Sequence, residues 1–504
     1  MSKQDKAFFG HPMGLAILFG TEMWERFSYY GMRAILVLYM TASTIGGADA
    51  RGIGLGWSEK EALALYGWYT MLVYIMSIPG GMIADKLLGQ KKTVMIGAIT
   101  LVIGHGVLVM TDVWAFYTGL ALVILGVGML KPNISTMVGG LYKEGDIRRD
   151  KGFSLFYVGI NAGSLLATIF VAIVVEKWGW HAGFGLAGVV MLLGLVNYTL
   201  GQRYLKEVGN HTVVKEDPNE VSYVKLFRDL FSSPKQLTIF IGLIVVSLIG
   251  WYGMDWAYGA LFIFLSIVTA LMMMIYKELP AQIFKDRFVV LLVSFIMVII
   301  FWGAFEQAGG LMTLYTDTKT DRFLFGWEIP TIMFQSLNAG FIIIFATAVA
   351  SFWAKRKLKL KEASSLFKMA MGIIIMGLGF VFMVFAVMQF EQSGTSSLIW
   401  LVFAYLFHTI GELCLSPVAL SFITKLAPVK YASLIMGVYF AATGLGSKVA
   451  GIVGESASNF GEYAVFLGIF LFTIVIGVLF IILLKPLKRL AHGAEENEHI
   501  LEEA

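Results

Sequence analysis

The sequence predicts an all-α integral membrane protein that crosses the bilayer fourteen times. Of its 504 residues, 58% are hydrophobic and only 14% are charged, a balance that soluble globular domains do not have. The apolar residues gather in long runs, and the hydrocarbon core of a bilayer, about 30 Å thick, takes about 20 residues per helix. Charged residues or clusters of Gly, Asn and Asp separate fourteen such runs.

The predicted spans end where charged or turn-forming residues interrupt the apolar pattern. They are 11–42, 59–84, 92–110, 113–140, 151–175, 181–203, 236–253, 257–278, 288–316, 327–354, 366–390, 397–425, 430–455 and 461–487. Only the short break at Trp251–Trp256 separates the seventh span from the eighth, and a fused helix there would put the chain ends on opposite sides. The first run is too long for a cleaved signal peptide, so we expect it to span the membrane.

The distribution of lysine and arginine predicts the orientation. Alternate loops and the two ends hold 29 of the 38 basic residues, against five on the other side and four inside helices. Because basic residues collect in cytoplasmic loops, we expect both termini in the cytoplasm. The five on the other side are Arg51, Lys60, Lys177, Lys319 and Arg322.

The loop lengths suggest two six-helix bundles with an inserted helix pair between them. We expect a first bundle at 11–203, a cytoplasmic linker at 204–235, an inserted two-helix hairpin at 236–278, a second bundle at 288–487 and a cytoplasmic tail at 488–504. Paired bundles of this kind are typical of transporters that rock around a central site.

Several function classes lack their sequence signals. Cys414 is the only cysteine, and the chain has no HExxH or CxxC spacing, no phosphate-binding loop and no soluble domain large enough for an ATPase. We therefore expect no enzyme activity, no cofactor, no metal and no nucleic-acid partner, and no obligate protein partner is evident. Transport by such a chain is driven by an ion gradient or by none.

Charged residues inside the predicted spans are the main functional signal, because each costs at least about 2.5–3.5 kcal/mol to insert at mid-bilayer. The first span carries Glu22, Glu25, Arg26 and Arg33, with Tyr29 and Tyr30 between them. Their spacing places all six on one broad helical face. We expect this face to line a cavity or to contact other helices.

Depth along the helices suggests two ion pairs. At 1.5 Å per residue, Lys131 lies roughly 14 Å and Glu22 roughly 16 Å from their cytoplasmic ends. A Lys131–Glu22 bridge would break when the carboxylate takes a proton, or it could be purely structural. Arg33 and Glu306, one in each bundle, also lie at comparable depth. They could form a bridge that closes one half of the cavity, or act as two poles for a zwitterion.

Other buried polar residues are candidates for the wall of the cavity. Glu412 is a further buried acid, and Asn161 and Asn338 are amides that can donate and accept at once. Trp302, Tyr439 and Phe440 are possible pocket walls. We interpret His408 and His105 as core histidines, and Lys448 with Glu455 as a structural pair in the extracellular half.

These motifs together resemble the bacterial proton-dependent oligopeptide transporter (POT) family of the major facilitator superfamily, over nearly the whole chain. The first-span element Glu22-x-x-Glu25-Arg26-Phe27, followed by Tyr29, Tyr30, Gly31 and Arg33, matches the family's ExxERF motif. GGMIADKLLGQKKTV, FSLFYVGINAGSL, FEQ at 305–307 and GELCLSP at 411–417 match in order. The superfamily loop motif, with Gly81, Asp85, Gly89, Lys91 and Lys92, has no convincing copy in the second half, where SFWAKRKLKLKE keeps only the cations.

The resemblance implies symport of di- and tripeptides with protons across the inner membrane, by alternating access. It implies a role in proton coupling for Glu22, Glu25, Arg26, Lys131 and Glu306. It implies a substrate site of Tyr29, Tyr30, Arg33, Tyr74, Lys131, Asn161, Trp302, Glu306, Asn338, Glu412 and Ser416. Tyr74 is favoured over Tyr69 for the tyrosine of the second span. That span lacks the histidine of animal relatives, so the proton site should be based on carboxylates.

Other functions remain open at this point. A proton-coupled carrier for another small organic anion or a drug would keep the same charged residues. A channel is disfavoured, because the buried charges are divided between two bundles rather than arranged in rings. A membrane enzyme is disfavoured too, because no nucleophile with a base or set of metal ligands shares a surface.

Overall fold

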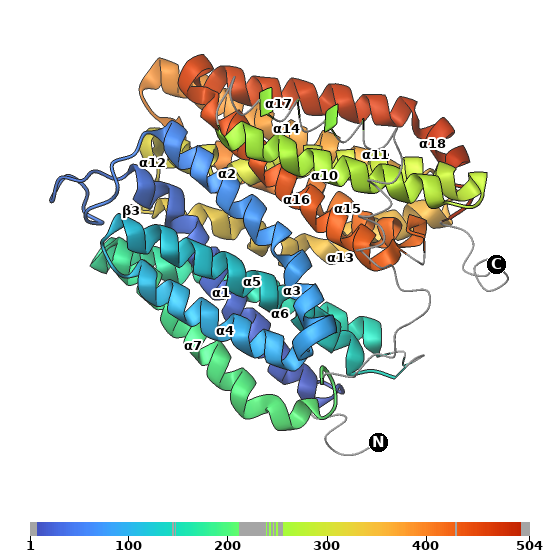
Figure 1. The fold of residues 1–504 in the computed structure, drawn as a ribbon. Helices are drawn as coiled ribbons and strands as arrows, with labels where there is room; N and C mark the ends of the chain where they lie inside the picture. Colours follow the sequence, from blue (N-terminus) through green and yellow to red (C-terminus); the bar gives the residue numbers. More distant parts are fainter. Residues whose placement is uncertain are drawn as a thin grey trace. The chain divides into compact units, whose positions relative to one another are not determined.

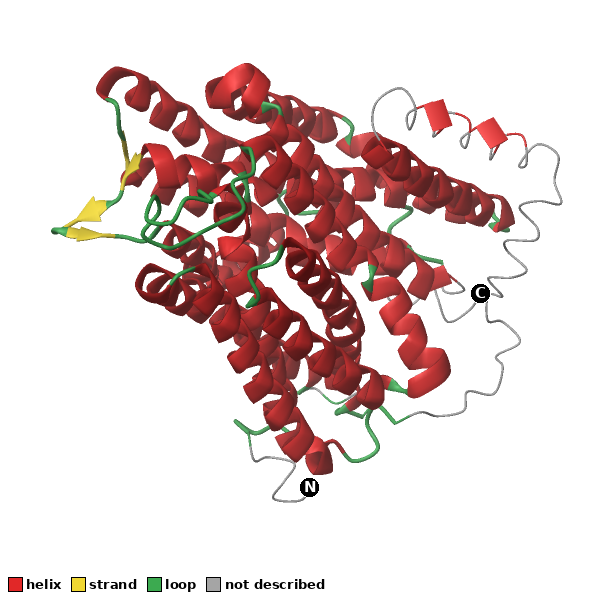
Figure 2. Ribbon diagram, turned by 60° about the vertical axis from the view of Figure 1, so that its left-hand side comes forward, coloured by secondary structure: helices red, strands yellow, loops and turns green. Residues whose placement is uncertain are grey.

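The computed structural model describes residues 8–143, 146, 148–210, 256–428 and 431–494, together with six isolated positions between 238 and 249. Helices make up nearly all of it, with two very small pairs of strands (Figures 1 and 2). This agrees with the all-α membrane class that the sequence predicts.

The first half of the chain forms α1 to α7. Their bounds are α1 (Met13–Thr41), α2 (Glu59–Ile75), α3 (Ser77–Ile83), a π-helical turn η2 (Ala84–Leu88), α4 (Gln90–Leu108), α5 (Val113–Gly140), α6 (Arg149–Trp178) and α7 (Trp180–Leu205). Ser58 caps α2 in a reciprocal capping box with Glu61, which fixes where that helix begins.

The second half forms α10 to α18. The bounds are α10 (Trp256–Glu278), α11 (Gln282–Phe305), η3 (Glu306–Gly309), α12 (Leu311–Lys319), η4 (Thr331–Gln335), α13 (Ser336–Leu358), α14 (Ser365–Ser393), α15 (Leu398–Leu426), α16 (Ala432–Glu455), α17 (Ala457–Ile482) and α18 (Leu484–Leu490). Strand β1 (Thr320–Asp321) pairs in parallel with β4 (Ser396–Ser397), and β2 (Phe323–Leu324) pairs antiparallel with β3 (Trp327–Glu328).

Twelve helical segments among the described residues are long and apolar enough to cross a membrane. Helix α1 is not among these twelve, although it has 29 residues, because Glu22, Glu25, Arg26 and Arg33 make it too polar for a purely apolar span. Most of the predicted span at 236–253 lies outside the described residues. The predicted span at 288–316 starts earlier, at Gln282, and contains a break at η3.

Close backbone contact holds α4 against α5 in the first half. A Cβ atom on Gly97 would lie 2.8 Å from the carbonyl oxygen of Gly126, and one on Gly126 would lie 2.9 Å from that of Gly97. Small residues allow such close approach, which replaces the hydrophobic driving force that helices lack in lipid. Large apolar side chains instead point outward along α7 and α17, as lipid-facing surfaces require; they include Leu193, Leu200, Phe472, Val475 and Ile482.

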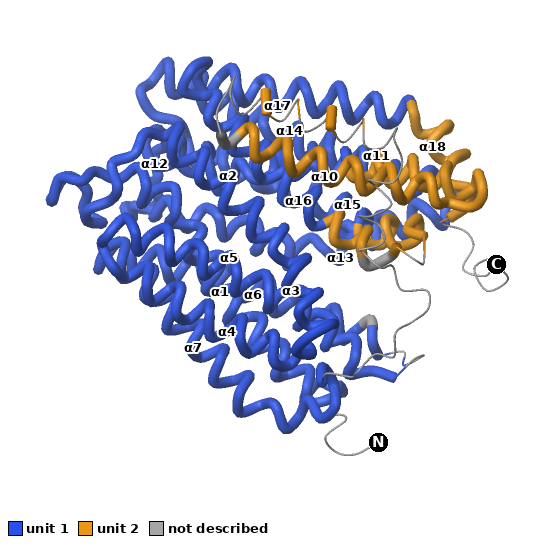
Figure 3. Tube along the Cα trace, in the orientation of Figure 1, with its two compact units in different colours: residues 1–212, 296–419, 440–482 blue, residues 213–295, 420–439, 483–504 orange. Residues whose placement is uncertain are grey.

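The chain divides into two compact units (Figure 3). The first comprises Met1–Thr212, Ile296–Ala419 and Phe440–Ile482, and the second comprises Val213–Phe295, Leu420–Tyr439 and Leu483–Ala504. The first unit holds α1 to α7 and most of the second-half helices, and all residues of the site described below belong to it. The boundaries that loop lengths suggest, at 204–235, 236–278 and 288, stay a prediction.

Candidate functional site

A buried ion pair between the two halves joins α1 to the break after α11. Arg33 Nη2 donates to Glu306 Oε2 at 2.5 Å, and Arg33 Nε donates to the Tyr66 hydroxyl at 2.8 Å. The Tyr66 hydroxyl in turn donates to Glu306 Oε2 at 3.2 Å. All three side chains are buried. An ion pair at this depth persists because each charge satisfies the other and the tyrosine supplies a further hydrogen bond.

The position of Glu306 depends on an interruption of the helix. Helix α11 ends at Phe305, η3 continues for four residues as a 3-10 turn, and Gly310 adopts a non-helical backbone before α12 resumes. A Cβ atom on Gly309 would collide with the Tyr66 hydroxyl and lie 3.1 Å from Arg33 Nη2. Interrupted helices are common where transporters bind charged groups. The glycine makes room here for the two residues that hold Glu306.

A second cluster of charges lies about two to three turns earlier on α1. Arg26 Nε is 3.3 Å from Glu22 Oε1, and its guanidinium also forms a short two-point contact with Glu25. All three side chains are almost completely buried. The second carboxylate oxygen of Glu22, Oε2, has no hydrogen-bond partner among the described residues. With two carboxylates and one guanidinium, this cluster carries an excess of one negative charge when all three are ionised.

The predicted Glu22–Lys131 bridge is not formed in this structure. Glu22 pairs with Arg26 instead, and Lys131 Nζ lies 4.5 Å from the centre of the Tyr74 ring on α2. Glu22 and Lys131 still lie within electrostatic range of each other, which agrees with their similar depth along the helices. Depth did not predict that Arg26, one turn from Glu22 on the same helix, provides the closer cation.

A third cluster lies within the second half, between α13 and α15. The Asn338 side-chain amide donates to Glu412 Oε2 at 2.8 Å and to the Thr409 hydroxyl at 3.1 Å. Asn338 and Glu412 are half-buried. The amide therefore occupies one carboxylate oxygen of Glu412 in this structure.

The two tyrosines of α1 connect these clusters. The Arg26 guanidinium lies 5.2 Å from the Tyr29 ring centre and 5.7 Å from that of Tyr30, and Arg33 lies 5.7 Å from Tyr30. Tyr30 also lies within electrostatic range of Glu306 and Glu412. The half-buried Tyr30 side chain thus lies among charged residues of both halves.

Other predicted residues are placed as follows. The Asn161 amide donates to the Tyr157 carbonyl one turn earlier at 2.9 Å, so it acts within its own helix. Trp302 packs its ring edge to face against Phe305 with centres 5.2 Å apart, and its Nε1 has no partner among the described residues. Ser416 is half-buried one turn after Glu412.

The residues interpreted as structural lie in the interior. His105 and His408 are buried, and His408 lies 4.5 Å from the Phe380 ring centre, but no ring nitrogen of either histidine has a hydrogen-bond partner among the described residues. Lys448 Nζ lies 3.6 Å from Glu455 Oε1, as predicted for this pair.

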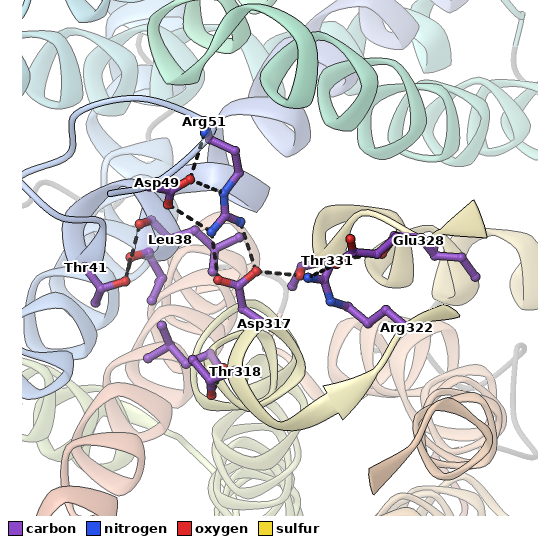
Figure 4. A network of polar contacts seen from close by, with 12 residues as sticks. Leu38, Thr41, Asp49, Arg51, Asp317, Thr318, Arg322, Glu328 and Thr331 are labelled. Carbon is purple, nitrogen blue, oxygen red and sulfur yellow. Dashed lines mark hydrogen bonds and ion pairs between the residues drawn. The ribbon is translucent and has the colours of Figure 1, made fainter. Parts of the chain in front are cut away.

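Sequence reasoning missed Tyr66 and a second ionic contact between the halves. Arg51, in the loop after α1, binds Asp317 of α12 through two contacts of 2.9 Å (Figure 4). Asp49 and Thr331 extend this network. Burial alone would lower the pKa of Arg51, but the hydrogen bonds and charges of Asp317 and Asp49 outweigh it and raise the pKa above its ordinary value.

The halves also touch where α2 meets α16. A Cβ atom on Gly451 would lie 2.9 Å from the Cα atom of Gly67 and the carbonyl oxygen of Leu63. This contact, the Arg33–Glu306 pair and the Arg51–Asp317 pair all lie toward the side on which α1 ends. The two halves are therefore closed against each other on that side.

The described residues hold no group of three or more His, Cys, Asp or Glu side chains that could bind a metal ion. The buried charges instead form ion pairs on several helices of both halves, around tyrosines and amides. Such groups can exchange partners when the halves move or when a carboxylate takes a proton. Fold and site together define a multi-span membrane carrier of the secondary-transporter class.

Comparison with known proteins identifies the family. The profile of the POT family matches residues 91–465, which is more than half of the chain. The chain belongs to the POT family, which is a family of transporters rather than enzymes. Its fold is of the major facilitator type.

Similar proteins cover nearly the whole chain. The uncharacterized transporter YclF of Bacillus subtilis (strain 168) is 37% identical over 98% of this chain and 97% of its own length. The peptide transporter YePEPT of Yersinia enterocolitica is 37% identical over 89% and 88%. The di-/tripeptide transporter of Lactococcus lactis subsp. cremoris is 34% identical over 97% and 98%.

Solved structures agree with this assignment. A mutant of the peptide transporter POT in complex with alafosfalin superposes with a TM-score of 0.81 at 34% identity, covering 97% of both chains. A POT family transporter in complex with 5-aminolevulinic acid has a TM-score of 0.80 at 30% identity, covering 96% of this chain and 98% of that one.

Proposed function

We propose that this chain is a proton-coupled symporter that imports di- and tripeptides across the inner membrane by alternating access. The observation that carries the proposal is the Arg33–Tyr66–Glu306 cluster, which joins the two halves through buried charges. The similarity to di-/tripeptide transporters over nearly the full length supports the substrate class.

Peptide recognition requires groups for two charged ends and tolerance for what lies between. Arg33 and Lys131 provide cations for the peptide carboxylate, and Glu306, Asn161 and Asn338 provide acceptors for the amino group. Tyrosine rings supply apolar walls that fit many side chains. The proposed substrate site consists of Tyr29, Tyr30, Arg33, Tyr74, Lys131, Asn161, Trp302, Glu306, Asn338, Glu412 and Ser416.

The Arg33–Glu306 pair is formed in the closed arrangement. The peptide therefore competes with Glu306 for Arg33, and with Arg33 for Glu306. A peptide carboxylate that takes Arg33 releases Glu306, and a proton on Glu306 releases Arg33. Opening of the side on which α1 ends requires this pair to separate. Proton and peptide binding thereby become coupled to the movement of the halves.

Proton uptake is assigned to carboxylates in the first half together with Glu306. Glu22 has an oxygen without a hydrogen-bond partner among the described residues, so it can accept a proton without losing a bond at that atom. Protonation of Glu22 would leave Glu25 as the only ionised partner of Arg26 in this cluster. It would also remove a negative charge near Lys131. The proposed coupling residues are Glu22, Glu25, Arg26, Lys131 and Glu306.

The orientation follows from the basic residues. With 29 of 38 lysines and arginines on the side of the termini, we assign both termini to the cytoplasm. The side closed by Arg51 and Asp317 is then extracellular. We retain the division into a first bundle at 11–203, a linker at 204–235, an inserted pair at 236–278, a second bundle at 288–487 and a tail at 488–504.

Uptake of radiolabelled dialanine into proteoliposomes tests this proposal. With an inward proton gradient, the protein should concentrate the peptide, and a protonophore should abolish the accumulation while leaving peptide exchange intact. Uphill uptake that persists without any proton gradient would overturn the proton coupling. Uptake of no peptide from a broad panel would overturn the substrate class.

A second candidate is a proton-coupled carrier for another small organic anion. A family transporter at 30% identity is known in complex with 5-aminolevulinic acid, which carries an amino group and a carboxylate as a peptide does. Competition against dialanine uptake separates the two candidates. Peptides should compete more strongly than 5-aminolevulinic acid if peptides are the substrate.

A further inference from the structure

The end of α13 presents an unusual basic and apolar surface. Residues 355–361 read KRKLKLK, and we call this segment the basic cap. The side chains of Lys355, Lys357, Lys359 and Lys361 are exposed. Leu358 is 83% exposed and Leu360 96% exposed, between these lysines.

The backbone holds Leu360 in an unfavourable conformation. Lys361 N–H donates to the Arg356 carbonyl at 3.2 Å and Leu360 N–H donates to the Lys357 carbonyl at 2.9 Å, which together form a Schellman motif. Leu360 occupies its left-handed position with φ +54°. Glycine is strongly preferred there, because other residues pay about 1–2 kcal/mol. A leucine in this position, exposed to solvent, stabilises nothing within the described residues.

The lysines of the basic cap are not neutralised by neighbouring groups. Glu362 is the only acid between residues 350 and 368. Arg356 is occupied by the Glu362 carbonyl at 2.6 Å and by the Phe367 ring. Lys355, Lys357, Lys359 and Lys361 form no side-chain hydrogen bond or ion pair with any described residue. Four positive charges therefore face outward together.

The basic cap continues an exposed stripe of α13. Positions 344, 348, 352 and 355 of α13, and position 359 directly after it, are all exposed and are spaced for one helical stripe. The stripe begins with Ile344, continues through Phe352 and ends with Lys355 and Lys359. Apolar residues followed by lysines at a helix end match the change from acyl chains to headgroups at a bilayer surface.

We propose that the basic cap is a docking surface for anionic phospholipid headgroups of the leaflet on the side of the termini. The lysines would bind the phosphates, and Leu358 and Leu360 would insert between acyl chains. Clusters of four or more basic residues beside a transmembrane helix favour anionic lipids in this way. The burial of Leu360 in lipid then offsets the strain of its backbone. This proposal does not depend on which solute the protein carries.

A fluorescent probe at residue 360 tests the proposal directly. The only native cysteine, Cys414, is buried, so L360C can be labelled selectively with an environment-sensitive dye on the full-length protein. In nanodiscs of phosphatidylcholine with roughly 30% phosphatidylglycerol, the emission of the dye should shift to shorter wavelength relative to its emission in pure phosphatidylcholine. The same dye on K143C, an exposed position, is the probe control.

A matched pair of charge variants identifies the group responsible. In K357Q/K359Q/K361Q, retention of phosphatidylglycerol measured by native mass spectrometry should fall by about fivefold per lysine. The control K143Q/K425Q/K485Q removes equal charge from exposed lysines elsewhere on the chain and should retain the lipid. Equal loss in both variants would show a non-specific charge effect and overturn the assignment.

Two further outcomes would also overturn it. A dye at residue 360 that responds equally to both lipid compositions would show that the leucines do not insert. Displacement of phosphatidylglycerol by millimolar glycerol phosphate would show a site for a soluble phosphate instead. Dialanine uptake is measured in parallel, so that failure of transport is distinguished from failure of lipid binding.

Discussion

Arg33 and Glu306 are 273 positions apart in the chain, yet their side chains meet at 2.5 Å in a buried ion pair. Each residue comes from a different half of the molecule, and Tyr66 bonds to both. The pair can therefore report on closure of the two halves. It also predicts how substitutions should combine.

We expect Arg33→Ala to destabilise the protein strongly, because it leaves Glu306 buried without its cation. Loss of one partner of a buried pair costs about 3–5 kcal/mol. Arg33→Ala/Glu306→Ala should recover part of this loss, since no uncompensated charge then remains. Thermal unfolding in detergent measures the double-mutant cycle. Strictly additive effects of the two substitutions would show that the contact contributes no coupling energy.

Gly309→Ala should disrupt the same cluster without removing any polar group. The added methyl group would collide with the Tyr66 hydroxyl, so either Tyr66 or the turn η3 must move. We expect dialanine uptake to fall at least as much as in Tyr66→Phe. Gly310→Ala is the matched control, because the one close neighbour of its Cβ would be Leu63 Cδ2 at 3.1 Å, the flexible end of a side chain, while Tyr66 Cδ1 at 3.8 Å and the Glu306 carbonyl oxygen at 3.9 Å are at ordinary contact distance. Equal uptake in both glycine variants would contradict this role of Gly309.

Gly451→Leu should prevent the halves from closing on the side where α1 ends. The close approach of α16 to Gly67 on α2 leaves no space for a side chain. We expect loss of uptake, together with increased accessibility of a cysteine placed at Leu63, which is buried one turn earlier on α2, to a membrane-impermeant reagent from outside. Gly468→Leu on α17 serves as the control, because nothing lies within 4 Å of its Cβ position. Unchanged accessibility in Gly451→Leu would argue against closure at this contact.

The sequence predicted the helical class because hydropathy and helix length follow directly from the thickness of the bilayer. It also predicted that Arg33 and Glu306 could meet, because buried charges of opposite sign lie at comparable depth. Depth does not define the direction of a side chain around its helix. For this reason the partner of Glu22 was predicted as Lys131, whereas the structure has Arg26.

The role of Tyr66 could not be predicted from the sequence, for a related reason. A tyrosine in an aromatic-rich helix carries no charge, and nothing in its spacing distinguishes it from Tyr69 or Tyr74. The break at Glu306 is weakly signalled by the two glycines that follow, Gly309 and Gly310. Arg51 and Asp317 lie at the ends of spans, where charged residues are expected, so neither indicated a contact between the halves.

A pH-dependent contact is expected at His11, which precedes the first residue of α1, Met13. His11 Nδ1 lies 2.9 Å from the Tyr142 hydroxyl. Burial, followed by the charge of Arg148, lowers the pKa of His11, and the opposing charge of Asp146 and the smaller effect of Lys151 do not reverse this. Because the pKa of His11 is lower in the folded protein than in the unfolded chain, neutral His11 contributes fully to the stability of the fold above a pH of about 6.5. This contribution is lost as the pH falls below that value.

Between about pH 7 and about pH 5, the melting temperature of the wild type should therefore fall more steeply than that of His11→Gln. Glutamine keeps an acceptor for Tyr142 but does not titrate. Tyr142→Phe is the control, since it removes the hydrogen bond and keeps the histidine, so it should retain the steeper slope at a lower melting temperature. Identical slopes in wild type and His11→Gln would rule out His11 as the titrating group.

Glu22→Gln should separate proton coupling from peptide movement. The amide keeps the size of the side chain but cannot cycle between charged and neutral forms, so gradient-driven accumulation of dialanine should stop. Peptide counterflow, which needs no net proton transfer, should continue. Lys131→Ala should also stop accumulation, because its ammonium lies within electrostatic range of Glu22 and against the Tyr74 ring. Normal accumulation by both variants would place the proton elsewhere, and Glu25 and Glu306 would then be the remaining carboxylates among the proposed coupling residues.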